Sequence, residues 1–334
     1  MRMKRCSFLP QTAFHNRFDI TLTDAESGAV RCRARAFNLV CEALWERLSC
    51  DGTEDALGGD YFRYIVYGSG SGTPYSSDTR LFSREGAAEL REENGRIFTC
   101  SVDPETNTAA VSGHIRLGMS DAVGVTITEV GIGYDEIHVV NHAMLEDMNG
   151  NPLSVTKTDT DILDITATVF LHFPANEEGT SRFLLPQSGE DVLRGGLIMW
   201  LAGAFRETEM SCAEGLPCRY LLASAEAPEA VPIPVTSGLP ANAGEAQALS
   251  FSAEDRKYRV SFRFPGNSGN IAGGIRYLAL CSRMPGAEED SGDVLVPELV
   301  FPYTGENGRE PIPKDEEHLL FFDAALSFSD GAAG

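Results

Sequence analysis

Basic side chains are scarce in this sequence. Its 334 residues include 27 Lys and Arg against 49 Asp and Glu, which gives a formal net charge of −22 at pH 7. Surfaces that bind nucleic acid or anionic membranes need clustered Lys and Arg. The charge balance therefore argues against nucleic acid as a partner.

Long apolar runs and paired cysteines are also lacking. No stretch reaches the roughly 20 apolar residues of a membrane-spanning helix, and no apolar segment follows the basic residues at the start, as a secretory signal would require. The eight cysteines form no Cys-x-x-Cys pair, and only Cys212 and Cys218 are close enough in sequence for a local bridge. We expect synthesis in a cytoplasm, no membrane insertion and reduced, mostly buried thiols.

Apolar residues make up 43% of the chain, together with 33 Gly and 17 Pro between short apolar runs. That content suffices for packed cores and favours β structure. The length suggests two domains, at about 100–200 residues each.

The chain repeats one pattern of elements. Apolar residues at helical spacing predict short helices near 37–48 and 197–205, and each is followed by an Arg-Tyr pair and an apolar strand. Alternating strands close both copies, at 163–173 and 320–328. We predict a mainly β fold with an N-terminal arm and β-hairpin (1–36), a β-sandwich domain (37–173), a linker (174–188) and a second β-sandwich domain that repeats the first (189–334).

The N-terminal hairpin carries the one dense basic stripe of the sequence. Arg31, Arg33 and Arg35 alternate along its returning strand, so they share one face. The stripe is either a solvated face neutralised by nearby acids or a docking surface for an acidic partner.

Most motifs that suggest chemistry fail on spacing. Gly68, Gly70 and Gly72 lack the Lys of a phosphate-binding loop and the spacing of a dinucleotide turn, so we expect a flexible loop. His138 and His142 lie roughly 13 Å apart if the segment is a strand, too far for one ion. The run 147–151 resembles half of a calcium loop, but a hairpin turn explains it more simply. We therefore expect no cofactor and no metal.

Glu129 interrupts an otherwise apolar strand, where a charge is costly unless it is paired. We expect a salt bridge or hydrogen bond inside the sandwich. The alternative, one member of a glycosidase acid pair, needs a second carboxylate at a defined distance. Tyr277 takes the equivalent position in the second copy, so the role of Glu129 is not shared by both copies.

A family resemblance rests on two short motifs within about residues 18–173. The first is a glycine loop that leads to an Asp-Thr pair, and the second is the Glu129-Val-Gly strand. The loop motif comprises Gly68, Gly70, Gly72, Thr73, Pro74, Asp78, Thr79 and Leu81. This combination resembles a module of bacteriophage tail fibre and tail-associated proteins. The resemblance implies a structural protein of a phage or phage-tail-like particle, without catalysis.

Three functions remain open at this point. The leading one is a non-enzymatic component of a tail fibre, baseplate or fibre attachment, located in the virion, oligomeric there and in contact with other tail proteins. The second is an adhesin that binds cell-surface glycans through tyrosines near loops, namely Tyr61, Tyr67, Tyr75, Tyr134 and Tyr303. The third, a polysaccharide-degrading enzyme, lacks an identifiable second carboxylate.

Overall fold

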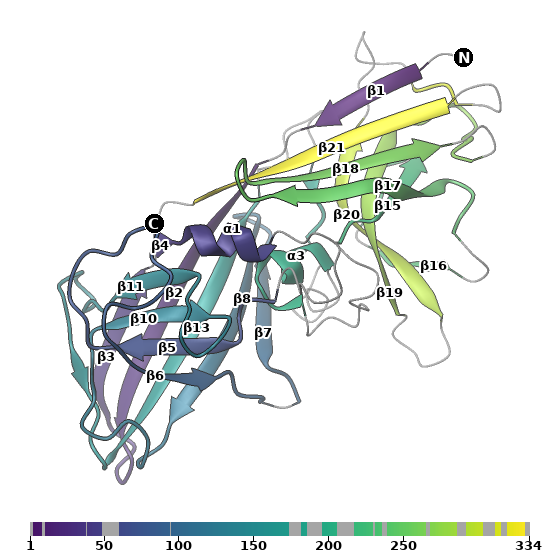
Figure 1. Cartoon of the computed structure of the whole chain (residues 1–334). Helices are drawn as coiled ribbons and strands as arrows, with labels where there is room; N and C mark the ends of the chain where they lie inside the picture. The colour runs from purple at the N-terminus through teal and green to yellow at the C-terminus, as the bar shows by residue number, and fades with distance from the viewer. Residues whose placement is uncertain are drawn as a thin grey trace.

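The structure is a computed structural model, and it confirms a mainly β, sandwich-like fold (Figure 1). The residues it describes are 3–8, 11–37, 39–48, 60–93, 95–173, 182–185, 196–205, 217–229, 231–235, 239–264, 268–285, 292–302, 311–314 and 319–330.

The first half of the chain contains β1 (Met3–Phe8), β2 (Gln11–Asp24), β3 (Val30–Phe37), β4 (Leu39–Val40), α1 (Glu42–Leu48), β5 (Tyr64–Gly68), β6 (Arg84–Glu89), β7 (Phe98–Asp103), β8 (Thr108–Leu117), β9 (Thr126–Ile127), β10 (Glu129–Gly133), β11 (Asn141–Met144), β12 (Val155–Thr156) and β13 (Asp161–His172). The second half contains β14 (Arg182–Phe183), α3 (Gly196–Leu201), β15 (Tyr220–Ser224), β16 (Ile233–Val235), β17 (Ala243–Ser252), β18 (Lys257–Phe264), β19 (Tyr277–Pro285), β20 (Asp293–Pro302) and β21 (Leu319–Asp330).

Two sheets build the first half. One has the order β3-β2-β13-β8-β7, and the other has the order β4-β11-β10-β5-β6. Alternate residues of β13 face the core and are fully buried from Leu163 to Leu171, as the period-2 pattern predicts. An isolated bridge between Arg35 and Glu146 joins β3 to the segment after β11 and closes one side of the sandwich.

The second half has the same order of pairings. Strand β17 pairs with β15 near its start and with β18 after a register shift between Ala246 and Ala248, so it takes the places of both β6 and β7. The orders β14-β20-β19-β15 and β18-β21 correspond to β4-β11-β10-β5 and β8-β13 of the first half. The pairing of β16 with β20 and that of β9 with β12 have no counterpart in the other half among the described residues. Gly68 pairs with Glu129 at one end of a ladder, and Ser224 pairs with Tyr277 at the matching end of the other.

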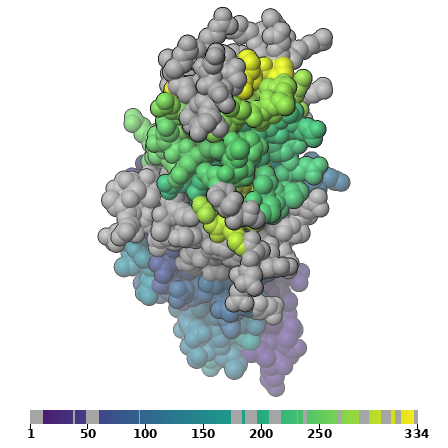
Figure 2. Space-filling view, turned by 90° about the vertical axis from the view of Figure 1, so that its right-hand side faces the viewer, coloured from purple at the N-terminus to yellow at the C-terminus, as the bar shows by residue number. Residues whose placement is uncertain are grey.

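The N-terminal strands join the two halves. Strand β1 and the first residues of β2 run parallel to β21 in one constant register, from Met3 opposite Leu319 to Phe14 opposite Asp330. Further along, β2 pairs with β3 and β13 of the first half. Figure 1 shows β21 passing along β1 toward β2. In the space-filling view of Figure 2, the second half lies in front and the first half lies below and behind it.

A chain of aromatic rings crosses the junction. Trp45 of α1 packs on Phe14 and Phe328, Phe328 packs on Phe251, and Phe251 meets Trp200 of α3. Residues of both halves therefore belong to one hydrophobic core. The two predicted sandwiches share a sheet and a core instead of being separate bodies.

Several details differ from the sequence-based expectations. Arg182 and Phe183 of the expected linker form β14 and pair with β20. Both helices are shorter than predicted: α1 begins only at Glu42, after β4, and α3 ends at Leu201, where Gly203 adopts a φ of 76°. Gly150 has a φ of 82° in the expected Asn-Gly turn, whereas its counterpart at 307–308 lies outside the described residues, as does Cys212.

Candidate functional site

Asp78 of the glycine-loop motif and Glu129 of the strand motif both contact His142. These three residues are called here the carboxylate–histidine clasp. Glu129 begins β10 and lies opposite Gly68, the last residue of β5. His142 lies in the neighbouring strand β11. Asp78 comes from segment 68–83, the glycine loop, which connects β5 with β6. The strand register thus places a carboxylate and an imidazole beneath this loop.

Glu129 fastens the glycine loop through three backbone amides. The N–H groups of Gly70 and Ser83 donate to its Oε1 at 2.9 and 2.8 Å, and that of Phe82 donates to Oε2 at 3.0 Å. Oε2 also lies 2.7 Å from Nε2 of His142. Both ends of the loop are therefore held by one fully buried carboxylate.

His142 links the two carboxylates of the clasp. Its Nδ1 lies 2.8 Å from Oδ2 of Asp78, which also accepts the N–H of Tyr75 at 2.9 Å. The ring of Phe82 meets the imidazole edge-on at 4.6 Å between centroids and covers it. The imidazole is fully buried and bonded at both nitrogens.

These contacts shift two pKa values in opposite directions. Burial raises the pKa of Glu129, but the hydrogen bonds from His142 and the three amides outweigh it, so the pKa lies below its ordinary value of 4.5. Burial lowers the pKa of His142, but hydrogen bonds to Glu129 and Asp78 outweigh it, so the pKa lies above 6.5. Both shifts favour the charged forms, an imidazolium beside carboxylates.

The glycines of the motif make room for the clasp. A Cβ on Gly68 would lie 2.6 Å from Oε1 of Glu129, and one on Gly70 would collide with the same oxygen and with the Cβ of Phe82. Gly72 has a φ of 145°, which disfavours other residues. The buried carboxylate therefore explains the glycines at positions 68 and 70. The loop is tied down, which corrects the expectation of a flexible loop.

The other motif residues have simpler roles. The carbonyl of Thr79 accepts the N–H of Val139, and the side chain of Leu81 is buried against Val66 and Val139. Thr73 is exposed and Pro74 is half-buried. The motif as a whole builds and anchors one loop.

Glu129 and His142 of the clasp are fully buried, and the side chain of Asp78 is 16% exposed. The two oxygens of Glu129 are occupied by amides and by His142, and the nearest further carboxylate of the clasp, Asp78, lies across the imidazole. Within the part of the chain that the structure describes, no group of His, Cys, Asp or Glu side chains is arranged to hold a metal ion.

The basic stripe is partly neutralised from within. Arg31 pairs with Asp24 and lies 3.0 Å from Asp161, and Arg35 lies 3.5 Å from Asp19. Arg33 is exposed and has no ion pair with the described residues. Arg33 thus differs from Arg31 and Arg35, which both have acidic partners.

The tyrosines proposed for glycan stacking are mostly unavailable. Tyr61 is fully buried, with its hydroxyl donating to the carbonyl of Leu201 at the end of α3, and Tyr67 is buried as well. Tyr134 lies under the guanidinium of Arg47 at 4.4 Å. Tyr75 is exposed, and Tyr303 lies outside the described residues.

The sequence-based reasoning missed a second buried carboxylate, Glu298 of β20. Its Oε1 accepts the N–H of Leu197 at 2.7 Å, and its Oε2 accepts from the hydroxyl of Ser282 and the thiol of Cys218. Burial raises the pKa of Glu298. The signal was a Glu within the apolar run 294–301, the same signal that singled out Glu129.

In comparisons with known proteins, no family model, no curated protein and no solved structure matches the chain. Neither helix among the described residues has the length and apolar character to cross a membrane.

Proposed function

We propose that the chain is a non-enzymatic structural component of a bacteriophage tail or phage-tail-like particle, and that it acts through protein–protein contacts. The observation that carries the proposal is the clasp. The two motifs of the resemblance, far apart in sequence, meet in space as one device that fixes a surface loop. A fixed loop suits a particle component because a preorganised surface loses little entropy on docking.

The shared sheet and core support the same proposal. The pairing of β2 with β21 and the aromatic contacts connect the two halves directly. A mechanical force on one half would therefore reach the other through paired strands and packed side chains. The tandem repeat is part of the proposal. The second half keeps the pairings of the first but has Ser224 and Tyr277 where the clasp has Gly68 and Glu129. Only the first half therefore presents the fastened loop.

The docking surface we favour is the free edge of β3 around Arg33. The backbone N–H and C=O of Arg35 form hydrogen bonds with Glu146, on the side of β3 away from β2. Backbone groups two residues apart in a strand point to the same side, so the N–H and C=O of Arg33 also point away from β2. Among the described residues, β3 has no other strand on this side. An acidic strand of a neighbouring tail protein would gain main-chain hydrogen bonds and an ion pair with Arg33.

A particle-attachment assay tests this surface. Tagged chain is added to the particle fraction from cultures of the organism from which the sequence derives, and bound chain is measured after sedimentation. We expect Arg33→Ser to bind more weakly than the native chain and Arg276→Ser, an exposed arginine of the second half, to bind normally. Native binding should also fall as salt rises from about 0.05 to 0.5 M. Equal binding of both variants at every salt concentration would remove Arg33 from the docking surface.

A further inference from the structure

Three exposed apolar side chains lie around the clasp. Tyr75 and Phe82 of the glycine loop are 63% and 42% exposed, and Leu39 of β4 is 37% exposed. The thiol sulfur of Cys41 lies 3.8 Å from the carbonyl oxygen of Leu39 and 4.0 Å from that of Tyr75. Leu39 also lies opposite His142, whose ring meets that of Phe82. Tyr75, Phe82 and Leu39 are therefore neighbours, called here the loop patch, and grouped exposed apolar residues are typical of a contact surface.

The loop patch is held in place before any partner arrives. The carboxylates of the clasp accept the backbone N–H of Tyr75 at 2.9 Å and that of Phe82 at 3.0 Å. The carbonyl of Ser76 accepts the N–H of Glu42, the first residue of α1, at 2.7 Å. Since these bonds order the loop in advance, contact with a partner costs little further entropy.

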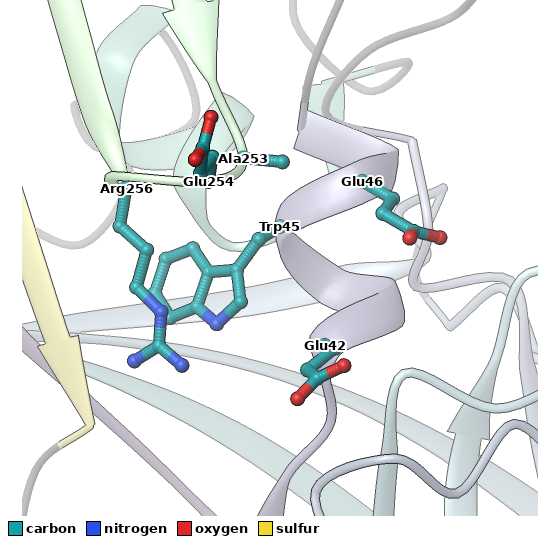
Figure 3. Close-up of a pocket in the computed structure, with 6 residues that line it drawn as sticks. All are labelled: Glu42, Trp45, Glu46, Ala253, Glu254 and Arg256. Carbon is teal, nitrogen blue, oxygen red and sulfur yellow. The ribbon is translucent and has the colours of Figure 1, made fainter.

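The second half of the chain contacts α1 elsewhere. Trp45 extends from α1 toward Arg256, whose guanidinium lies 4.8 Å from the ring centroid, beside a cavity of about 380 Å³ next to the turn that connects β17 with β18 (Figure 3). The lining of that cavity includes no residue of the glycine loop. The junction of the halves therefore leaves the loop patch open to a partner.

The distribution of charge shows where two copies of this chain can approach each other. Copies that each carry a net charge of −22 repel one another. The sixteen residues of the glycine loop include one carboxylate, that of Asp78, and its Oδ2 is turned onto His142. Repulsion between two copies is therefore small at this loop, where the apolar side chains favour association.

Beside the loop patch lies one exposed charge of each sign. Arg80 lies 3.1 Å from Nε2 of His138 and has no ion pair with the described residues. Glu136, two residues before His138, is exposed, with Arg84 3.8 Å away. Across a twofold axis, Arg80 of each copy can pair with Glu136 of the other, as a self-complementary contact requires. We propose that two copies of this chain associate through the loop patch as a twofold-symmetric dimer.

This inference rests on the proposed function, because it names the partner of the loop that the clasp fixes. Salt screens the repulsion between two acidic copies and leaves the apolar contact in place. Dimerisation should therefore hold or tighten as salt rises, whereas attachment through Arg33 should weaken. The two contacts can thus be measured separately.

Sedimentation equilibrium of the purified chain measures the association directly. We expect a reversible monomer–dimer equilibrium with a Kd of about 10–100 µM, the weak range that suits a small patch. Tyr75→Ser and Ser77→Glu should each weaken dimerisation about tenfold or more, because the first removes the most exposed ring and the second brings like charges together. Met148→Ser and Ser120→Glu, at exposed positions outside the patch, should dimerise as the native chain does. A thermal melt of each variant checks that it is folded.

An exchange of charges tests the twofold arrangement. Arg80→Glu should weaken dimerisation, and the double variant with Glu136→Arg should restore it. The proposal is overturned if the native chain stays monomeric up to about 0.5 mM, if the loop variants dimerise like their controls, or if the exchange restores nothing. It is also overturned, in favour of another protein on the loop patch, if the chain is monomeric and Tyr75→Ser weakens attachment to particles. A dimer that does not sediment with particles contradicts the proposed function alone, and a monomer that does contradicts the dimer alone.

Discussion

Replacing Glu129 by Gln keeps the shape of the side chain and removes the charge that fastens the glycine loop. In the native chain its two oxygens accept from Gly70, Phe82 and Ser83 and meet Nε2 of His142. A glutamine amide has one oxygen and one NH₂ group. If the oxygen takes the place of Oε1, the NH₂ group faces the donors on the Oε2 side, which are the N–H of Phe82 and Nε2 of His142. Breaking a buried charged pair on one side costs about 3–5 kcal/mol. We expect a loss of about that size in the free energy of unfolding.

The pH dependence of this loss follows from the two shifted pKa values. The low pKa of Glu129 gives stability that is present above about 4.5 and is lost as the pH falls through the folded-state pKa. The raised pKa of His142 gives stability that is present below about 6.5 and is lost as the pH rises through its folded-state pKa. The difference between native chain and variant should therefore be largest between about pH 4.5 and 6.5.

Urea denaturation gives the total loss, and hydrogen exchange of the amides of Gly70, Phe82 and Ser83 gives its location. Glu105→Gln, an exposed glutamate, serves as the control and should change neither quantity. If Glu129→Gln loses less than about 1 kcal/mol and the three amides stay protected, the charge of Glu129 does not hold the loop.

Three further predictions concern other parts of the chain. Gly70→Ala should destabilise the loop much as Glu129→Gln does, whereas Gly244→Ala, whose Cβ would meet Phe264 at an ordinary 3.4 Å, should be tolerated in the same denaturation series. Burial, His172 and Arg17 lower the pKa of His15 to about 4, so stability should fall as the pH drops from about 6.5 toward 4, and His15→Gln should flatten that limb of a stability–pH profile. Phe328→Ala should lower stability by about 3–5 kcal/mol while both halves still unfold in one calorimetric transition; two separate transitions in the native chain would contradict a shared core.

Local patterns predicted the elements of this fold well. The period-2 alternation of β13 and β21 depends only on side-chain order, which the sequence contains, and so does the placement of Tyr277 at the position equivalent to Glu129. The cost of burying a charge was enough to single out Glu129, although not its partners. His142 and Asp78 are 13 and 51 residues away in sequence, and only the strand register and the loop path bring them together.

Long-range parallel pairing was beyond sequence-based reasoning. Nothing local in Met3–Phe8 indicates a partner some 316 residues away, because a parallel pair without a connecting turn leaves no signal. The burial of Tyr61 depends on the carbonyl at the end of α3, another contact between the halves. Arg31 and Arg35 have acidic partners in the strands β2 and β13, whereas Arg33 has no ion pair with the described residues.

Electron microscopy with a labelled antibody tests the proposed role most directly. Particles are purified from cultures of the organism from which the sequence derives, and the antibody is raised against the recombinant protein. The proposal predicts that the label decorates the tail or its appendages and that the chain sediments with the particles. A chain that remains in the particle-free supernatant, with no label on any tail, would contradict it.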